Sequence, residues 1–253
     1  MGGLIGRIAM ITGVSSIKGL GFAIAGALAG EGASLVVCDL LGEKAKDCAR
    51  ELSGQGVKTL GLKIDVSDED SVLACIEEAR RCFGNVDILV NNAGVSSKRS
   101  IEELTLAEWK AAMDINVGGT FLCSKHLYQF MKSRGFGRII NISSISALQG
   151  GGKYVGAQYA TSKAAILGFT RVLAREAAPH GITVNAVAPS LVDTDILDGL
   201  LTDEMREMSV AGIPVGRLCT QQDVANAVRF FAMPESGFVT GITMSVNGGQ
   251  YIH

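Results

Sequence analysis

Residues 7–24 read RIAMITGVSSIKGLGFAI, an apolar run that is followed by a glycine-rich turn. The run at 7–12 has the nearly continuous apolar character of a parallel strand that is buried on both faces. Gly13, Gly19 and Gly21 then allow a tight turn and a close approach of the backbone to a ligand before a helix begins. This order predicts that a pyrophosphate group meets free amides at the N-terminus of the helix.

Beyond this stretch, short β-branched runs alternate with longer amphipathic stretches to the end of the chain. Further strands are expected at 34–39, 58–64, 87–92, 137–143, 183–188 and 243–246. Helix starts are indicated by Thr105 with Glu108, a capping box, and by Ser67 with Asp70, a looser version. We therefore predict an α/β fold in one domain over residues 1–253, with seven parallel strands flanked by helices. The stretch of about 189–220 has no strand pattern and is expected to cover a substrate.

The composition excludes several classes of protein. Hydrophobic residues make up 47% and charged residues 19%, as in a compact fold, and a net charge of -2 predicts no nucleic-acid or anionic-membrane partner. No apolar stretch is long enough for a membrane span and the N-terminal residues do not resemble a signal peptide, so we expect a cytoplasmic protein. The six cysteines and three histidines are dispersed without a C-x-x-C pattern, so neither a metal site nor a disulfide framework is expected.

Two acidic residues end predicted strands and are candidates for contacts with a nucleotide. Asp39 lies eighteen residues after Gly21, where a carboxylate can accept hydrogen bonds from both hydroxyls of an adenosine ribose. A solvated acid at a strand end is the alternative. Asp65, followed by Val66, could reach an adenine or cap the next helix.

The segment YVGAQYATSK at 154–163 holds two tyrosines and one lysine. Tyr159 and Lys163 are four residues apart and share one face of a predicted helix, whereas Tyr154 precedes that helix. A phenol is a poor acid or base at neutral pH unless a neighbour shifts its pKa, and an ammonium group can do so. Alone, this spacing also fits a solvated surface contact.

Five motifs in order decide between these interpretations. The glycine turn, NNAG at 91–94, Asn116 in DINVGGTF, NISS at 141–144 and YATSK at 159–163 together resemble a classical short-chain dehydrogenase/reductase. The resemblance covers essentially the whole chain and implies a Rossmann-like doubly wound domain, a nicotinamide dinucleotide, and hydride transfer between a secondary alcohol and a ketone.

The resemblance also implies a role for each catalytic candidate. Tyr159 would exchange a proton with the reacting oxygen, Lys163 would lower the pKa of Tyr159 and hold the nicotinamide ribose, and Ser144 would hydrogen-bond the reacting oxygen. Asn116 would anchor a water that links the lysine to solvent. The chemistry requires the same groups, since hydride addition leaves an alkoxide that needs a donor and a proton source.

The expected cofactor is NAD, with NADP less favoured. Asp39 would bind the ribose hydroxyls of NAD and repel the 2′-phosphate of NADP, whereas Lys18 could partly offset that repulsion. By resemblance alone, Asn91 and Ala93 would contact the cofactor, although this segment can equally serve to pin a neighbouring strand. The full set of predicted cofactor contacts is Gly13, Ser15, Lys18, Gly19, Leu20, Gly21, Asp39, Leu40, Asp65, Val66, Asn92, Ala93, Gly94, Tyr159, Lys163, Pro189, Val192 and Thr194.

Three departures from the family pattern affect the site. Five residues, rather than three, separate Thr12-Gly13 from the next glycine, and Ser146 rather than Ser144 has the customary separation from Tyr159. We choose Ser144 because it directly follows the predicted strand. The family's common Pro-Gly is Pro189-Ser190 here. Ser146, Tyr154, Gln158 and Leu191 are the expected substrate contacts.

Three functions remain open at this stage. The first is an NAD-dependent oxidoreductase of secondary alcohols or ketones, and the second is a reductase of 3-oxoacyl thioesters with the same motifs. The third is a dinucleotide-binding sensor without turnover, against which the intact set of four catalytic residues argues. A double-bond reductase is disfavoured because the residue seven before Lys163, where such enzymes have tyrosine, is Gly156. We expect a small-molecule substrate and a homotetramer, since 105–134 and 159–178 are apolar on more than one face.

Overall fold

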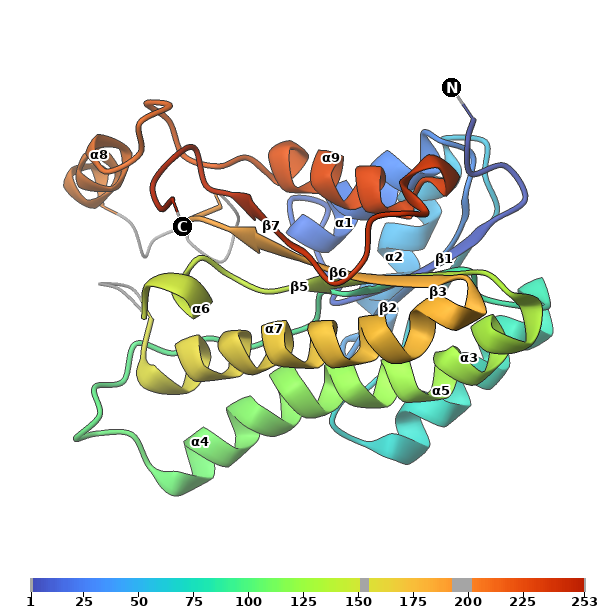
Figure 1. The fold of residues 1–253 in the computed structure, drawn as a ribbon, viewed down its shortest axis with the longest axis horizontal. Helices are drawn as coiled ribbons and strands as arrows, with labels where there is room; N and C mark the ends of the chain where they lie inside the picture. Colours follow the sequence, from blue (N-terminus) through green and yellow to red (C-terminus); the bar gives the residue numbers. More distant parts are fainter. Residues whose placement is uncertain (1, 151–154, 193–201, 253) are drawn as a thin grey trace.

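The protein is built on one parallel sheet, seen nearly edge-on in Figure 1. The computed structural model describes residues 2–150, 155–192 and 202–252. The strands are β1 (Ile8–Thr12), β2 (Ser34–Asp39), β3 (Thr59–Lys63), β4 (Ile88–Asn91), β5 (Gly137–Ile142), β6 (Ile182–Pro189) and β7 (Thr243–Val246). All of their pairings are parallel, in the order β3-β2-β1-β4-β5-β6-β7. The predicted α/β fold is confirmed, with each strand end within one residue of its expected position.

Helices cover both faces of the sheet (Figure 1). One face carries α1 (Leu20–Ala29), α2 (Gly42–Ser53) and α9 (Gln221–Ala232); the other carries α3 (Glu69–Phe83), α4 (Leu106–Met113), α5 (Gly119–Arg134) and α7 (Ala157–Ala177). The shorter elements are the π-helical turn η1 (Asp114–Gly118), α6 (Ser146–Gln149), η2 (Ala178–His180), α8 (Asp203–Ala211) and η4 (Pro234–Ser236).

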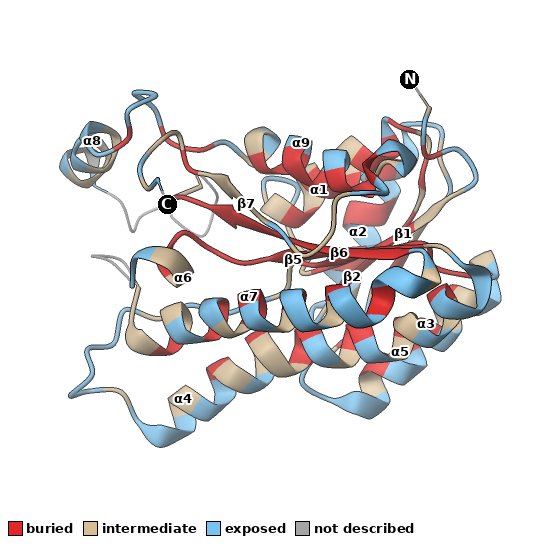
Figure 2. Ribbon diagram, viewed as in Figure 1, coloured by how far each residue is buried: buried red, intermediate tan, exposed pale blue. Residues whose placement is uncertain are grey.

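The near-continuous apolar strands supply two cores, one on each face. Because successive strand residues point to opposite faces, Ile11 and Val37 belong to the core under α1 and α9, while Met10 and Val36 belong to the core over α3 and α5. Figure 2 shows the strands buried between the two helical layers. This is the arrangement that a doubly wound sheet requires.

The strand order reverses between β1 and β4. The chain runs β1, β2 and β3 toward one edge of the sheet, then returns to place β4 on the other side of β1. The carboxyl ends of all strands meet at one edge, where α6 and α8 lie in Figure 1. A ligand crevice is expected at this point of reversal in doubly wound folds.

The two predicted helix starts had different outcomes. Thr105 and Glu108 form the expected reciprocal capping box of α4. The prediction for α3 was wrong: Asp68 caps this helix by accepting from the Asp70 amide, whereas the Ser67 hydroxyl donates to the Asp65 carboxylate at 2.6 Å. The Ser67 hydroxyl is therefore bound to the Asp65 carboxylate and does not cap α3, as the sequence pattern had predicted it would.

Candidate active site

The turn between β1 and α1 is closely packed, as the glycine pattern predicts. Gly13 has a φ of 77°, and a Cβ on Gly21 would run into the carbonyl oxygen of Gly13. The side-chain amide of Asn92 donates to the carbonyls of Thr12 and Gly13 at 2.9 and 3.0 Å. Only glycine fits at these two positions without displacing backbone, so the turn keeps the shape that a close ligand contact needs.

The N-terminus of α1 is open to an anion. Its N-cap, Gly19, makes no side-chain cap, and the first turn of the helix contains no acidic residue. The first amides of such a helix, together with its dipole, favour a phosphate group. Gly19 and Leu20 lie at this end, with Ser15 half-buried in the preceding turn. These residues could hold the pyrophosphate of a dinucleotide.

The two extra residues of this turn are accommodated in a locally closed loop. The Ser16 carbonyl accepts from the Gly19 amide at 3.0 Å, and its hydroxyl accepts from the Lys18 amide at 3.2 Å. Gln221 of α9 donates to the Lys18 carbonyl at 3.2 Å. The Lys18 side chain is exposed, so its ammonium is free to approach a ligand at the mouth of the site.

Of the two predicted acidic contacts, Asp39 is the last residue of β2, and Asp65 lies two residues after the end of the neighbouring strand β3. Asp39 is half-buried at the end of β2 and accepts from the Leu41 amide at 3.0 Å, while Leu40 beside it is 56% exposed. Asp65 accepts from the amide and hydroxyl of Ser67 and does not cap α3. Val66 is buried against Gly119 of α5, so its side chain belongs to the core.

The segment at 91–94 pins neighbouring strands and helices, which was the alternative to cofactor contact. Asn91 is buried and donates to Asn141 on β5 and to Ser124 on α5, at 2.8 and 3.1 Å. The amide of Ala93 donates to the Thr12 hydroxyl at 3.0 Å. Gly94 is exposed, and a Cβ there would lie 3.1 Å from Asn116 Oδ1 and 3.4 Å from Lys163 Nζ.

Asn116 lies in η1, where the helix between α4 and α5 widens to a π-turn. Such turns occur often at functional sites. Its Oδ1 accepts from the Val95 amide at 2.8 Å, and its Nδ2 donates to the Val95 carbonyl and to the Ser162 hydroxyl at 3.0 and 2.8 Å. The side-chain amide is thus engaged with the protein. The backbone carbonyl of Asn116 accepts from the Thr120 hydroxyl at 2.8 Å.

Tyr159, Lys163 and Ser144 come together at the carboxyl edge of the sheet. Burial raises the pKa of Tyr159, while a hydrogen bond with the Ser144 side chain acts to lower this pKa. Burial lowers the pKa of Lys163 to about 8. Lys163 Nζ donates to the Ile142 carbonyl at 2.8 Å and lies 5.7 Å from the centre of the Tyr159 ring.

This arrangement differs in one respect from the expectation. The pKa shift of Tyr159 is caused by burial and by the hydrogen bond with Ser144, and the Lys163 ammonium is directed to the backbone at the end of β5. The phenol is therefore protonated at neutral pH and can act as an acid toward a reacting oxygen. A lysine with a pKa near 8 is, in turn, poised to exchange a proton near neutral pH.

The structure favours Ser144 over Ser146 as the partner of Tyr159. Ser144 makes the hydrogen bond with Tyr159, and its Oγ also accepts from the Ser146 amide at 3.1 Å. Ser146 begins α6 and is buried. Two further serines that the motifs did not single out hold the site together: Ser143 donates to the Lys163 carbonyl and Ser162 accepts from Asn116. Ser143 lies in the motif NISS and Ser162 in the motif YATSK, so their place in these motifs could have identified them from the sequence.

The remaining predicted contacts lie around the same edge. Gln158 is buried beside Tyr159, and its amide is 3.4 Å from the Ser97 carbonyl. Pro189 ends β6, Leu191 is half-buried, and Val192 forms an isolated parallel bridge with Cys219. The bridge joins the two ends of the stretch at 189–220, within which α8 is found. Tyr154 and Thr194 lie outside the described residues.

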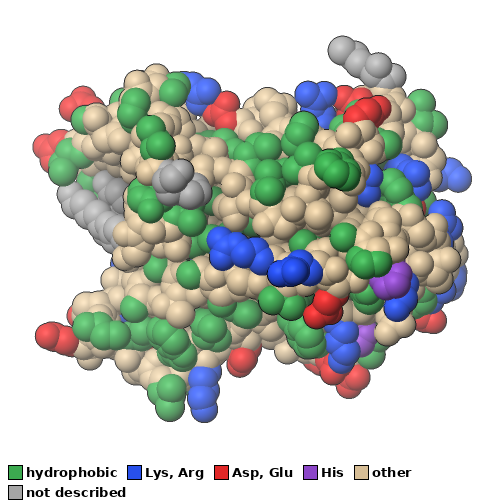
Figure 3. Space-filling view, in the orientation of Figure 1, with side chains coloured by type: hydrophobic (Ala, Val, Ile, Leu, Met, Phe, Trp, Pro, Cys, Tyr) green, Lys and Arg blue, Asp and Glu red, His purple; other side chains and the backbone are tan. Residues whose placement is uncertain are grey.

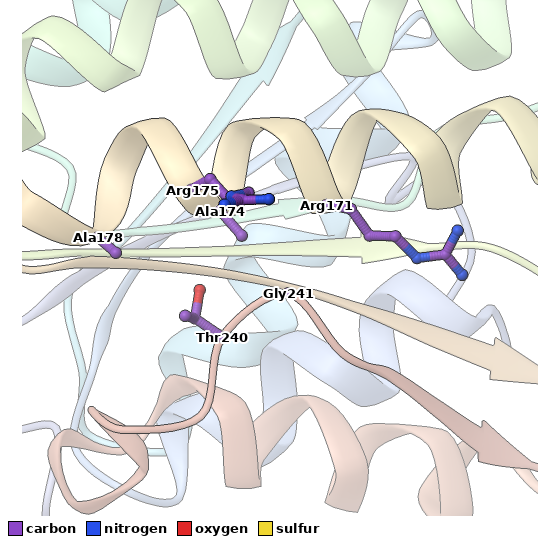
Figure 4. A pocket seen from close by; sticks show the side chains of 6 residues that line it. All are labelled: Arg171, Ala174, Arg175, Ala178, Thr240 and Gly241. Atoms are coloured by element: carbon purple, nitrogen blue, oxygen red, sulfur yellow. The ribbon is translucent and has the colours of Figure 1, made fainter.

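A shallow pocket of about 330 Å³ lies elsewhere, between α7 and the loop before β7 (Figure 4). Arg171, Arg175 and Thr240 are among the residues that line it. None of the predicted site residues does, so this pocket is not the candidate active site. Among residues 2–150, 155–192 and 202–252, no cluster of histidine, cysteine or acidic side chains could hold a metal. No helix in the described part of the chain could span a membrane.

Comparisons with known proteins agree with this geometry. The profile of a family described as Enoyl-(Acyl carrier protein) reductase matches residues 13–250. The chain is 40% identical over 247 residues to the 3-oxoacyl-(acyl-carrier-protein) reductase FabG of Escherichia coli, covering 98% of each protein. It is 40% identical over 244 residues to the cis-4-hydroxycyclohexanecarboxylate dehydrogenase of Sinomonas cyclohexanicum, covering 96% of each. A solved structure of a putative short-chain alcohol dehydrogenase from Sinorhizobium meliloti 1021 superposes with a TM-score of 0.91 at 31% identity, covering 98% of this chain and 97% of the other.

Proposed function

This chain belongs to the short-chain dehydrogenase/reductase family of oxidoreductases, and on that premise we propose that it interconverts a secondary alcohol and its ketone with NAD(H). The observation that carries the proposal is the Tyr159 phenol, hydrogen-bonded to Ser144 and carried with the buried Lys163 on one face of α7. A proton donor and a second hydrogen-bonding group thus converge at the strand end where the fold places its ligand crevice.

Each residue has one task in the proposed reaction. The dinucleotide, when bound, supplies or accepts the hydride. In reduction, Ser144 donates a hydrogen bond to the carbonyl oxygen and Tyr159 gives its phenolic proton to the same oxygen as negative charge develops there. Lys163, held against the Ile142 carbonyl and with a pKa of about 8, can return a proton to the resulting phenolate. Asn116 helps to position the catalytic side chains through its hydrogen bonds with the Val95 amide and the Ser162 hydroxyl.

We propose NAD(H) as the preferred cofactor because of Asp39. Its carboxylate is half-buried at the end of β2, held by the Leu41 amide, and would face the ribose hydroxyls. A 2′-phosphate there would meet a like charge a few ångströms away, an unfavourable contact of about 1 to 4 kcal/mol depending on screening. The Lys18 ammonium would offset only part of this repulsion, because its exposed side chain loses conformational entropy when it is held against a phosphate.

A reductase of 3-oxoacyl thioesters is the second candidate. The names of several relatives favour it, among them FabG of Aquifex aeolicus, 36% identical over 249 residues. A carrier-bound substrate would need a basic patch near the mouth of the pocket; Lys98 and Arg99 offer only a small one, and Arg99 is paired with Glu108 at 3.1 Å. The enoyl reductase that the family description names would place a tyrosine at Gly156, which instead is the N-cap of α7. We therefore keep thioester reduction as the alternative and leave the enoyl reaction aside.

We also propose that the chain works as one domain in a homotetramer, with the stretch at about 189–220 covering the substrate. Large apolar side chains are exposed on the helices that were expected to associate: Leu106, Phe121 and Val172 are 67%, 46% and 59% exposed. Figure 3 shows hydrophobic side chains gathered over α4 and the neighbouring part of α7. Light scattering at micromolar protein should give a tetrameric mass, and a monomeric mass would contradict this assembly.

A substrate panel separates the three functions. Secondary alcohols, sugars, hydroxyacyl thioesters and sterols are each incubated with NAD, and NADH appearance is measured for the wild type and for Tyr159→Phe as the matched control. We expect at least one alcohol to be oxidised by the wild type and not by the variant. Turnover confined to hydroxyacyl thioesters would select the second candidate. NADH binding without turnover of any compound would favour a sensor.

A further inference from the structure

Four buried, uncharged polar side chains form a chain of hydrogen bonds that runs from α5, past β4 and β5, to α7. Asn91 Nδ2 donates to the Ser124 hydroxyl of α5 at 3.1 Å and to Asn141 Oδ1 at 2.8 Å. Asn141 Nδ2 in turn donates to the Thr170 hydroxyl of α7 at 2.9 Å. None of the four residues is more than 5% exposed, so bulk water does not replace a partner that is lost here.

Strand alternation places this chain on the face of the sheet that α5 and α7 cover. Leu89 and Ile139 belong to the apolar core on that face, and Asn91 and Asn141 lie two residues further along the same strands. Figure 1 shows α5 and α7 side by side over this face. A polar chain within an otherwise apolar layer fixes how the helices lie against the strands, because a shift would leave a buried donor unpaired.

Three successive residues at the end of β5 are bonded to α7. Asn141 donates to Thr170 through its side chain. The Ile142 carbonyl accepts from Lys163 Nζ at 2.8 Å, and the Ser143 hydroxyl donates to the Lys163 carbonyl at 2.8 Å. Lys163 and Thr170 are seven residues apart, nearly two turns of α7, so both face β5. These bonds together fix the place along the strand at which Lys163 lies.

We propose that Thr170 is a positioning residue for Lys163, an inference that rests on the proposed function. Thr170 lies about 10 Å from Lys163 along the axis of α7 and acts through Asn141 and the register of the helix, rather than on the substrate. Lys163 can return a proton to the Tyr159 phenolate only while its Nζ stays at the end of β5. The bond between Asn141 and Thr170 holds α7 in the register that keeps Nζ there.

The hydroxyl of Thr170 is needed as an acceptor. It donates its own proton to the Ile166 carbonyl at 2.8 Å within α7, and Asn141 uses its lone pair. Valine keeps the branched shape but offers no acceptor, so Thr170→Val leaves Asn141 Nδ2 unpaired at a fully buried site. Such an amide is unfavourable, so α7 should part locally from β5 more often. Each opening releases Lys163 Nζ from the Ile142 carbonyl.

Thr59 offers a matched control, because its hydroxyl also joins a strand and a helix. It lies on the outer strand β3 and donates to the Ala49 carbonyl of α2 at 2.8 Å. Thr59→Val should therefore lose a comparable hydrogen bond and leave Lys163 in place. Thr170→Ser keeps the hydroxyl and removes only a methyl group, so it is the conservative variant that should behave as the wild type does.

The test has two readouts, one of which needs no substrate. The rate at which an amine-reactive ester acylates Lys163 is measured by peptide mass spectrometry, with the exposed Lys44 as internal reference. Steady-state kinetics on a substrate from the panel give kcat and KM. For Thr170→Val we expect acylation about 3- to 10-fold faster and kcat about 3- to 10-fold lower, with KM nearly unchanged. Thr170→Ser and Thr59→Val should match the wild type in both readouts.

Three outcomes would overturn the inference. Unchanged acylation and kcat in Thr170→Val would show that Thr170 only fills the core. Equal changes in Thr59→Val would show a general loss of stability. A Thr170→Ser protein as impaired as Thr170→Val would assign the effect to the methyl group. If Thr170→Val does not fold, Thr170→Ala takes its place, and both readouts should change in the same direction.

The two readouts also separate this inference from the proposed function. A wild-type protein that turns over no compound of the panel would refute the proposed function. The acylation of Lys163 still reports in that case whether Thr170 holds the lysine at the end of β5.

Discussion

The carboxyl edge of the sheet has two halves, and its charged and polar side chains are exposed or half-buried in one half and buried in the other. In the half formed by β1, β2 and α1, Asp39 is half-buried, Lys18 is exposed, and the turn before α1 has closely packed glycines and no side-chain cap. In the half formed by β5, β6 and α7, Lys163 and Ser144 are only 4% and 8% exposed. We propose that the first half recognises a ligand through water-screened charges and that the second half changes the protonation of buried groups.

Burial explains why substitutions in the two halves of the carboxyl edge should have effects of different size. An exposed charge acts through a high effective dielectric, so removing it changes binding modestly. A buried group has lost its solvation, so its pKa shifts and its interactions are stronger. The pKa values of Tyr159 and Lys163 are both shifted by burial, in opposite directions. Substitutions in the buried half should therefore have the larger effects.

The largest effect is expected at Tyr159. Tyr159→Phe removes the phenolic proton and the hydrogen bond to Ser144 while retaining the ring, so kcat should fall by at least about 10²-fold with NADH affinity nearly unchanged. Tyr154→Phe is the control and should mainly raise KM. Steady-state kinetics on a substrate from the panel measure both, and a larger loss of kcat at Tyr154 would assign the chemistry to the other phenol.

Lys163 should reveal its burial through the pH dependence of stability. Its folded pKa is about 8, below the ordinary value of 10.5, so the unfolded chain binds more protons between these values and the free energy of unfolding rises with pH. Relative to Lys163→Met, the wild type should gain about 2 kcal/mol between about pH 8 and pH 9.5 in urea denaturation. Lys44→Met, which removes an exposed lysine of α2, is the control and should show no such pH-dependent difference. A wild-type advantage that does not change with pH would contradict the shifted pKa.

The smallest effect is expected in the exposed half, at the cofactor's ribose. The Asp39 carboxylate should make kcat/KM for NAD(H) at least about 10-fold higher than for NADP(H), equivalent to about 1.4 kcal/mol. Asp39→Ala should narrow this gap, and Lys18→Ala should widen it. Rates with NADPH that equal or exceed those with NADH in the unmodified protein would mean that Lys18 sets the choice.

The same contrast explains what the sequence could predict. The sheet was predictable because buried parallel strands are near-continuous apolar runs, and the turn at Gly13 and Gly21 because no other residue fits its backbone. The shared face of Tyr159 and Lys163 followed from helical periodicity. Each of these features depends on local backbone geometry, which a short stretch of sequence determines.

The features that could not be predicted depend on contacts between distant segments. The spacing at 159–163 does not show that the Lys163 ammonium is directed to the Ile142 carbonyl on β5. The cap of α3 was misassigned for a local reason instead, because the Ser67 hydroxyl donates to Asp65, which lies two residues before it and two residues after β3. The chain of hydrogen bonds from Ser124 to Thr170 appears only when α5, β4, β5 and α7 are placed side by side.

Isotope transfer shows directly whether a hydride passes from a carbinol carbon to the dinucleotide and whether Tyr159 is needed for it. The panel compounds are supplied with deuterium on the carbinol carbon and incubated with NAD, and the NADH formed is examined by mass spectrometry. We expect the wild type to form NADH that carries one deuterium, and Tyr159→Phe to form it at no more than about a hundredth of the wild-type rate. Isotope transfer at the same rate in both proteins, or dinucleotide binding with no transfer from any compound, would contradict it.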